Sequence, residues 1–208
     1  MADSSPGWQA VIFDFHGVIT TPPLAGVDAY EQELGLPAGA LTGYMRGHPM
    51  VHQLERNEID PRDYWRFIRS DVQEAHGLEI DLRRMVAEMD GAITIEPRMV
   101  ELVAALRGVY RTAMLTNVGK RSSRVFHADA FRDVFDVVVE SAAVGLRKPD
   151  PEIYRLVAER LGVPTTAAVF VDDWEENLPP AAELGMGTVV FESPDQCEAA
   201  LRELGLRW

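Results

Sequence analysis

Four places in the chain carry residue types that catalysis uses, and each follows a short apolar run. They hold Asp14, His16 and Gly17; Thr116 and Asn117; Lys148; and Asp172, Asp173 and Asn177. Three carboxylates gathered in one place repel each other unless a cation offsets their charge. Because the set contains oxygen ligands and no cluster of histidine or cysteine, the cation it favours is Mg²⁺. These four places therefore predict a magnesium site able to bind an anion.

The elements that must position these side chains are five apolar runs with the pattern of buried strands. They cover residues 10–13, 112–115, 137–139, 167–171 and 188–191. Helical patterns separate them, with predicted starts at Glu96-Pro97, at Asp150 as an N-cap, and at a capping box over 193–196. Strands that alternate with helices predict an α/β fold with a parallel sheet covered on both faces. Ligands of such sheets bind beyond the carboxyl ends of the strands, where the four polar places are expected.

Residues 22–92 interrupt this alternation, because they contain helical patterns and no convincing strand. The patterns cover 27–34, 41–46, 50–56, 61–76 and 82–89. The segment has 7 arginines and 13 acidic residues, so it is not a basic patch. We predict a helical cap domain over 22–92, inserted into an α/β core domain formed by 1–21 and 93–208.

The composition excludes several classes of protein. The chain has 208 residues and a net charge of −13, which argues against nucleic acid as a partner. No apolar run approaches the roughly 18 residues of a membrane span. The N-terminal residues lack the basic region of a signal peptide, and Cys197 is the single cysteine, so we expect a cytoplasmic protein. Nothing in the sequence indicates an oligomeric state.

In order and spacing, the four places resemble the motifs of the haloacid dehalogenase (HAD) superfamily of hydrolases. Asp14 falls at the nucleophile, Thr116 at the second motif, Lys148 at the third, and Asp172 with Asp173 at the fourth. The resemblance extends from Val11 to the last helix and includes the helical cap. Residues 170–177 resemble the phosphatase-type branch with small caps. The resemblance implies a Rossmann-like sheet sandwiched by helices, and a Mg²⁺-dependent phosphatase acting on a small phosphorylated metabolite.

The resemblance also implies a role for each of these residues. Asp14 would attack phosphorus to form an aspartyl-phosphate, which splits phosphoryl transfer into two easier steps. The metal would be held by Asp14, Asp172 and the backbone carbonyl of His16. The oxygens of the phosphoryl group would be bound by Thr116, Asn117 and Lys148. Asp173 and Asn177 would orient Lys148 and the water around the metal. Gly17 would allow a sharp turn of the backbone beside the nucleophile.

His16 departs from the family pattern, which normally places a second aspartate two residues after the nucleophile. That aspartate protonates the leaving oxygen and then activates water. An imidazole with a pKa near 6.5 can perform both tasks. The alternative is that the ring of His16 points away and the residue supplies only its carbonyl. The sequence leaves both interpretations open.

Three alternative functions can be compared with the sequence. Phosphonate-cleaving relatives form a Schiff base on a cap lysine, and residues 18–119 contain none, since Lys120 and Lys148 are the two lysines of the chain. Dehalogenases bind no Mg²⁺ and typically lack the paired aspartates of the fourth motif, so Asp172 and Asp173 argue against dehalogenation. The missing second aspartate of the first motif argues for it, and dehalogenation stays a minor alternative. A catalytically degenerate binding protein stays open, because the usual acid/base residue is missing. In the cap, Arg46 and His48 are candidates to reach the leaving group, whereas Tyr64, Trp65 and Ile68 have the spacing of a helix core face.

Overall fold

The computed structural model describes residues 7–120 and 133–208. Its centre is a five-stranded sheet in the order β3-β2-β1-β4-β5, and every pairing is parallel. This confirms the predicted α/β fold. The strands are β1 (Ala10–Phe13), β2 (Arg111–Thr116), β3 (Val137–Glu140), β4 (Ala168–Asp172) and β5 (Gly187–Val190).

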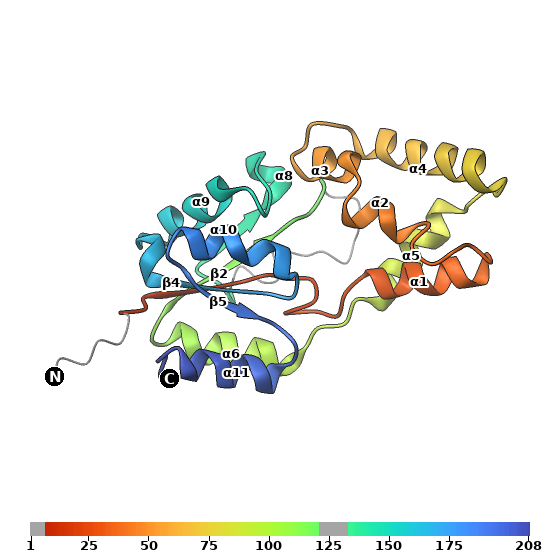
Figure 1. The fold of residues 1–208 in the computed structure, drawn as a ribbon. Helices are drawn as coiled ribbons and strands as arrows, with labels where there is room; N and C mark the ends of the chain where they lie inside the picture. The colour runs from red at the N-terminus through yellow and green to blue at the C-terminus, as the bar shows by residue number, and fades with distance from the viewer. Residues whose placement is uncertain (1–6, 121–132) are drawn as a thin grey trace.

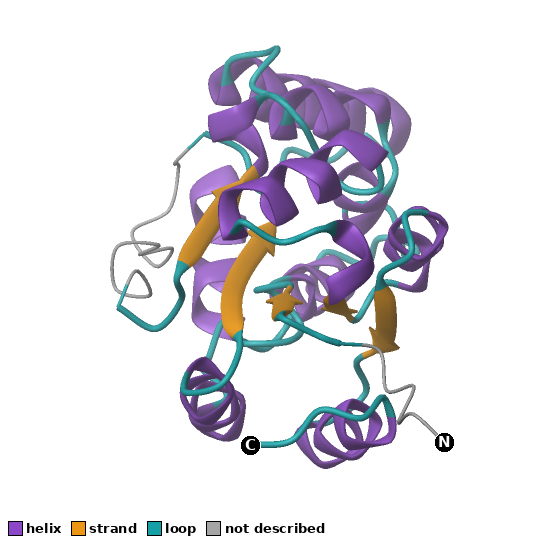
Figure 2. Ribbon diagram, turned by 90° about the vertical axis from the view of Figure 1, so that its left-hand side faces the viewer, coloured by secondary structure: helices purple, strands orange, loops and turns teal. Residues whose placement is uncertain are grey.

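Helices cover both faces of the sheet, as Figures 1 and 2 show. One face packs against α6 (Pro97–Arg107) and α11 (Pro194–Glu203), and the other against α9 (Pro151–Leu161) and α10 (Leu178–Glu183). The short helix α8 (Ser141–Val144) follows β3, and the 3-10 turns η1 (Thr165–Ala167) and η2 (Glu175–Asn177) flank β4. The sheet, these helices and these turns are together called the α/β core.

The two covered faces explain why the strands are continuous apolar runs and not alternating ones. In β1, Val11 and Phe13 contact the layer of α6 and α11, while Ala10 and Ile12 contact the layer of α9. All four residues are fully buried. Successive side chains of a strand point to opposite faces, so a strand between two helical layers must be apolar at every position.

The predicted helix starts are observed, but two of them differ in their hydrogen bonds. Glu96 caps α6 by accepting from the amide of Arg98. Asp150 occupies the N-cap position of α9, but its side chain makes no capping hydrogen bond. Ser193 accepts from the amide of Gln196, whereas the Gln196 side chain accepts from Glu192 and not from Ser193. The predicted capping box at 193–196 is therefore only half formed.

Five helices lie between β1 and α6, where the sequence predicts a helical insertion. They are α1 (Leu24–Glu33), α2 (Thr42–Arg46), α3 (Pro49–Glu55), α4 (Pro61–His76) and α5 (Leu82–Ala92). They share an apolar cluster that includes Val27, Tyr64, Ile68 and Met85, and this segment is called the cap. The carbonyl of Glu88 lies only 2.1 Å from where a Cβ of Gly26 would be, so α1 and α5 cross too closely for a larger residue.

The two connections between cap and α/β core run side by side. The amide of Thr21 donates to the carbonyl of Thr94, and the amide of Thr94 donates to the hydroxyl of Thr21. Thr20 and Ile95 form an antiparallel bridge next to them. The chain thus enters and leaves the cap at one place, beside the carboxyl end of β1, and Figure 1 shows the cap extending away from that end.

Candidate active site

The predicted site residues converge because three adjacent strands end at the same edge. Asp14 directly follows β1, while Thr116 is the last residue of β2 and Asp172 the last residue of β4. β1 lies between β2 and β4 in the sheet. Parallel strands place their carboxyl ends together, so residues about a hundred positions apart line one cavity.

Lys148 lies buried between two of these carboxylates. Its Nζ is 2.8 Å from Oδ1 of Asp14 and 2.6 Å from Oδ2 of Asp172, and its side chain is 1% exposed. Burial alone would lower the pKa of the Lys148 ammonium, but the two carboxylates outweigh burial and raise that pKa above its usual value. The ammonium is therefore a fixed positive charge beside Asp14.

Asn117 holds the backbone of Lys148 in place. Its side-chain amide donates to the carbonyl of Lys148 at 2.9 Å, and its side-chain oxygen accepts from the Lys148 amide at 2.8 Å. Asn117 also lines the cavity, as does Thr116. The reciprocal pair of hydrogen bonds gives Asn117 a positioning role that the sequence did not reveal, and its contact with substrate stays a prediction.

Both carboxylate oxygens of Asp172 have protein partners. Oδ2 accepts from Lys148, and Oδ1 accepts from the amide of Trp174 at 2.8 Å and the side chain of Asn177 at 3.0 Å. The residue is fully buried. Asn177 belongs to the 3-10 turn η2, and its side-chain amide points back at Asp172.

Asp173 differs from its neighbour, because its Oδ1 is buried and has no hydrogen-bond partner among the described residues. A buried carboxylate oxygen without a partner is unfavourable unless a cation or water binds it. Burial, followed by repulsion from Asp172, raises the pKa of Asp173 to about 6. The resemblance implies that Asp173 orients Lys148, but it is Asp172 that accepts a hydrogen bond from the Lys148 ammonium, and the choice of metal ligands stays a prediction.

Gly17 makes room for Asp173. The φ angle of Gly17 is +91°, and a Cβ at this position would lie 2.1 Å from Oδ2 of Asp173. The predicted sharp turn is therefore observed, and it has a second reason, the close approach of a carboxylate to the backbone.

The donor set fits a small divalent cation. Asp14, Asp172 and Asp173 each offer a carboxylate oxygen, and these oxygens all lie within 4.8 Å of one another. A cluster of acidic residues is not by itself evidence of a metal site, but the buried Asp173 oxygen that has no partner among the described residues is a second, independent indication of a bound cation. Oxygen-only ligands suit Mg²⁺, as the sequence predicts.

Asp14 has the surroundings of a nucleophile held in one orientation. Its Oδ1 accepts from the amide of Phe15 at 2.7 Å as well as from Lys148. Burial raises the pKa of Asp14 to about 8, although Lys148 acts in the opposite direction. A cation bound at the site would also lower this pKa and favour the ionised carboxylate.

His16 lines the same cavity, and its ring is held by the chain. Its Nδ1 is 3.2 Å from the hydroxyl of Thr20, and its ring meets that of Phe15 edge-on. Burial, followed by the charge of Lys148, lowers the pKa of His16 to about 4. The ring is therefore neutral at pH 7, a form that can accept a proton.

A cavity of about 570 Å³ extends from these residues to the cap. Trp174 lines it, and so do Arg46, Tyr64 and Trp65 of the cap. His48 instead caps α3, with its Nδ1 accepting from the amide of Met50 at 3.1 Å. Tyr64 and Ile68 are buried in the cap, as their spacing predicts, whereas Trp65 is only partly buried.

The sequence does not reveal a buried ion pair that joins the cap to the active site. Arg147 Nε donates to Oε2 of Glu55 at 2.7 Å, and both side chains line the cavity. Glu55 is in α3, 92 residues before Arg147. Only the position of Arg147 next to Lys148 could have drawn attention to it.

Comparison with known proteins assigns the family. Residues 8–185 match the family model of haloacid dehalogenase-like hydrolases. The chain belongs to this family. The HAD-like hydrolases similar to it include the phosphatase MT3486 of Mycobacterium tuberculosis, which is 34% identical over 94% of this chain and 93% of its own length.

Two further relatives show how far the similarity extends. The acyl-CoA dehydrogenase family member 10 of Mus musculus is 31% identical over 95% of this HAD-like chain, which spans only 19% of that relative's length. Among solved structures, a HAD family enzyme of Bacteroides thetaiotaomicron in complex with magnesium and inorganic phosphate has a TM-score of 0.67 and 22% identity. That match covers 89% of this chain and 95% of the other, and it shows the shared fold. Among the described residues, no helix of this HAD-like hydrolase combines the length and apolarity needed to cross a membrane.

Proposed function

We propose that this HAD-like hydrolase is a Mg²⁺-dependent phosphatase that acts on a small phosphomonoester through an aspartyl-phosphate on Asp14. The observation that carries the proposal is the arrangement at the end of β1, where a buried carboxylate lies 2.8 Å from a buried ammonium and beside a partnerless carboxylate oxygen. An anionic nucleophile and an anionic substrate repel each other. The positive charge of Lys148 and a cation on the acidic cluster would remove that repulsion.

Each residue has a task in this mechanism. Lys148 and Thr116 bind the oxygens of the transferring phosphoryl group and hold it in line with Asp14. Asp172 and Asn117 fix Lys148 from two sides, through its ammonium and its backbone. We assign the metal to Asp14 and Asp173, together with the carbonyl of His16, and when bound it neutralises charge on the phosphoryl group. The relative named a phosphatase supports the same activity.

His16 is the proposed general base, the half of the acid/base role that a neutral ring can perform, because its ring lines the cavity with Asp14. The leaving oxygen takes a proton from solvent water and departs as the alcohol, and the ring of His16 then accepts a proton from the water that attacks the aspartyl-phosphate. His16→Ala is therefore expected to lower turnover by roughly 10²–10⁴-fold. An unchanged rate and pH profile would instead mean that the residue contributes only its backbone.

The activity is tested by measuring phosphate release from a panel of phosphorylated metabolites, with and without Mg²⁺. Release should require Mg²⁺ and disappear in Asp14→Asn, while the circular dichroism spectrum stays unchanged. No release from any panel member, nor from p-nitrophenyl phosphate, would support the alternative of a binding protein without catalysis. Release by Asp14→Asn at the wild-type rate would contradict the nucleophile assignment.

The metal assignment predicts different behaviour for the two neighbouring aspartates. Mg²⁺ should raise the melting temperature of the wild type, because a ligand that binds only the folded state stabilises it. Asp173→Asn should abolish that increase and leave the metal-free stability nearly unchanged. Asp172→Asn should lower the metal-free melting temperature, because it removes one buried partner of Lys148. An abolished Mg²⁺ effect in Asp172→Asn with a normal one in Asp173→Asn would contradict the assignment.

A further inference from the structure

The active-site cavity has two chemically different ends. The end formed by the α/β core is polar and holds Asp14, Lys148 and Asp173. The end formed by the cap and its connections is lined mainly by apolar side chains. These include Leu24, Met45, Trp65, Val86, Met89 and Ile93, all of which are partly exposed.

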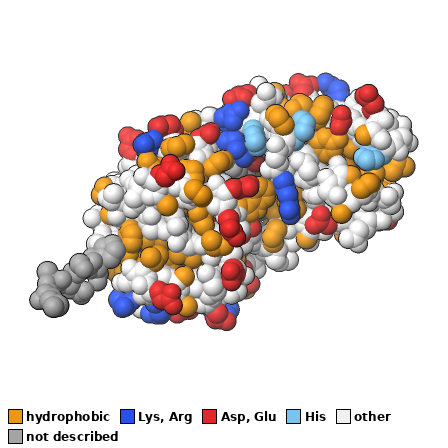
Figure 3. All heavy atoms as spheres, viewed as in Figure 1, with side chains coloured by type: hydrophobic (Ala, Val, Ile, Leu, Met, Phe, Trp, Pro, Cys, Tyr) orange, Lys and Arg blue, Asp and Glu red, His pale blue; other side chains and the backbone are white. Residues whose placement is uncertain are grey.

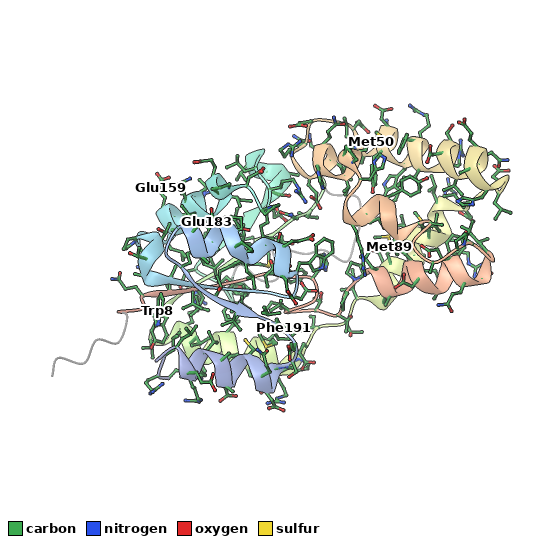
Figure 4. All side chains as sticks on the ribbon, in the orientation of Figure 1. Trp8, Met50, Met89, Glu159, Glu183 and Phe191 are labelled. Atoms are coloured by element: carbon green, nitrogen blue, oxygen red, sulfur yellow. The ribbon has the colours of Figure 1, made fainter. Side chains whose placement is uncertain are left out.

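These apolar side chains are not needed to close the interior of the cap. The cap has its own buried cluster, with Val27, Ile68, Val72 and Met85 each fully buried. Met89, which Figure 4 labels, lies on the side of the cap toward the α/β core. Apolar surface that faces a cavity between the cap and the α/β core is stabilised when an apolar ligand covers it. Such surface is typical of a ligand-binding site.

Two of the polar side chains at the cap end, those of Glu55 and Tyr64, are engaged with the protein itself. Glu55 is bonded to Arg147, and the hydroxyl of Tyr64 donates to the carbonyl of Tyr44 at 3.0 Å. Arg46 is exposed. A sugar or other polyol would lose hydrogen bonds to water here and find few replacements, and such a loss disfavours binding. Figure 3 shows apolar side chains gathered where the α/β core and the cap meet.

We propose that the leaving group of the substrate is an aliphatic or aromatic alcohol and not a polyol. This inference rests on the proposed phosphatase function for the polar end of the cavity. The volume of about 570 Å³ accommodates a group of the size of a typical small-molecule ligand in addition to the phosphate. The cap therefore selects an amphipathic phosphomonoester, with its phosphate at Asp14 and its apolar part against α4 and α5.

The test is a series of n-alkyl phosphates from ethyl to octyl, used below their critical micelle concentrations. We expect kcat/KM to rise about two- to fourfold for each added methylene, since each buried methylene stabilises binding by about that factor. Glycerol phosphate and glucose 6-phosphate should have kcat/KM values near that of ethyl phosphate. No increase along the alkyl series, or a preference for the sugar phosphates, would overturn the inference.

Near-isosteric variants locate the apolar end. Met89→Gln and Val86→Thr keep the side-chain size and add polarity, so both should lower kcat/KM for octyl phosphate about fivefold and change the value for ethyl phosphate less than twofold. Val109→Thr is the matched control, because Val109 is an exposed valine outside the cavity, with 62% of its surface accessible. Equal effects of Val86→Thr on ethyl and octyl phosphate would argue against the assigned position.

Binding of non-hydrolysable alkylphosphonates separates this inference from the proposed function. Calorimetry should show tighter binding of octylphosphonate than of ethylphosphonate, whether or not the protein turns over phosphomonoesters. Chain-length-dependent binding without any phosphate release would refute the phosphatase activity and keep the apolar specificity. Phosphate release with equal binding of both phosphonates would support the phosphatase activity and refute the apolar specificity.

Discussion

At the scale of single residues, two neighbouring aspartates have different environments in this site. Asp172 is surrounded by hydrogen-bond donors, whereas Asp173 has a buried oxygen without a partner among the described residues. Gly17, which has no side chain, leaves the space that the Asp173 carboxylate occupies. The position of this carboxylate therefore depends on a backbone conformation that only glycine adopts readily.

Gly17→Ala is expected to destabilise the protein by about 2 kcal/mol, from the positive φ angle and the clash with Asp173. Activity and Mg²⁺ affinity should fall at least about tenfold, because the carboxylate is displaced. Urea unfolding and calorimetry measure the two effects. Gly35→Ala is the control, since Gly35 has a φ of +68° and nothing beyond its chain neighbours lies within 4 Å of where its Cβ would be, so only stability should change. Normal Mg²⁺ affinity in Gly17→Ala would contradict this account.

At the scale of elements, the cap is joined to the active site by the pair of Glu55 in α3 and Arg147 in the loop before α9. Their side chains are 13% and 11% exposed, so the pair is largely removed from water. Burial raises the pKa of Glu55, while Arg147 and Lys148 act in the opposite direction. Gly119 adds a second contact, because a Cβ there would lie 2.8 Å from Leu54 of α3.

Removing one partner of this pair should be more damaging than removing both. Glu55→Ala leaves the buried guanidinium of Arg147 uncompensated and should destabilise the protein by about 3 kcal/mol in urea unfolding. The double variant Glu55→Ala with Arg147→Ala should lose less than the sum of the single variants. Arg155→Ala is the control, because it removes an exposed ion pair with Glu152 and should change stability by less than about 1 kcal/mol. Additive effects in the double variant would show that the pair is not coupled.

At the scale of the whole molecule, the sheet and its helical layers enclose the single cysteine. Cys197 of α11 is fully buried in the cluster between the sheet and α6. Burial raises the pKa of the Cys197 thiol to about 12, so the reactive thiolate is scarce at pH 8. The thiol becomes accessible only when α11 separates from the sheet.

Modification of Cys197 therefore reports opening of the α/β core. At pH 8 we expect a thiol reagent to react with the native protein more than about a thousandfold more slowly than with the protein in urea. The rate should increase as pH rises toward the ordinary thiol pKa of about 8.5, because the thiolate fraction of the opened state increases. A native rate equal to that of an unfolded chain would mean that α11 does not cover this face in solution.

Much of the fold follows from sequence patterns that act locally. The predicted strand at 10–13 and helix at 61–76 coincide with β1 and α4, and the other predicted strands differ by a residue or so at their ends. Apolar runs, prolines and capping residues act over a few positions, so they are visible in a single sequence. The turn η2 was not predicted, and two hydrogen bonds join it and the residue before it to Asp172.

The sequence by itself determined which residue types meet at the site, since the ends of parallel strands must lie together. Only the tertiary structure decided which of Asp172 and Asp173 binds Lys148, because adjacent residues leave a strand in opposite directions and the surrounding loops choose between them. The ion pair of Glu55 and Arg147 and the apolar end of the cavity likewise could not be predicted from the sequence. Both depend on how the cap packs against the α/β core, and no local pattern encodes a contact between residues 92 positions apart.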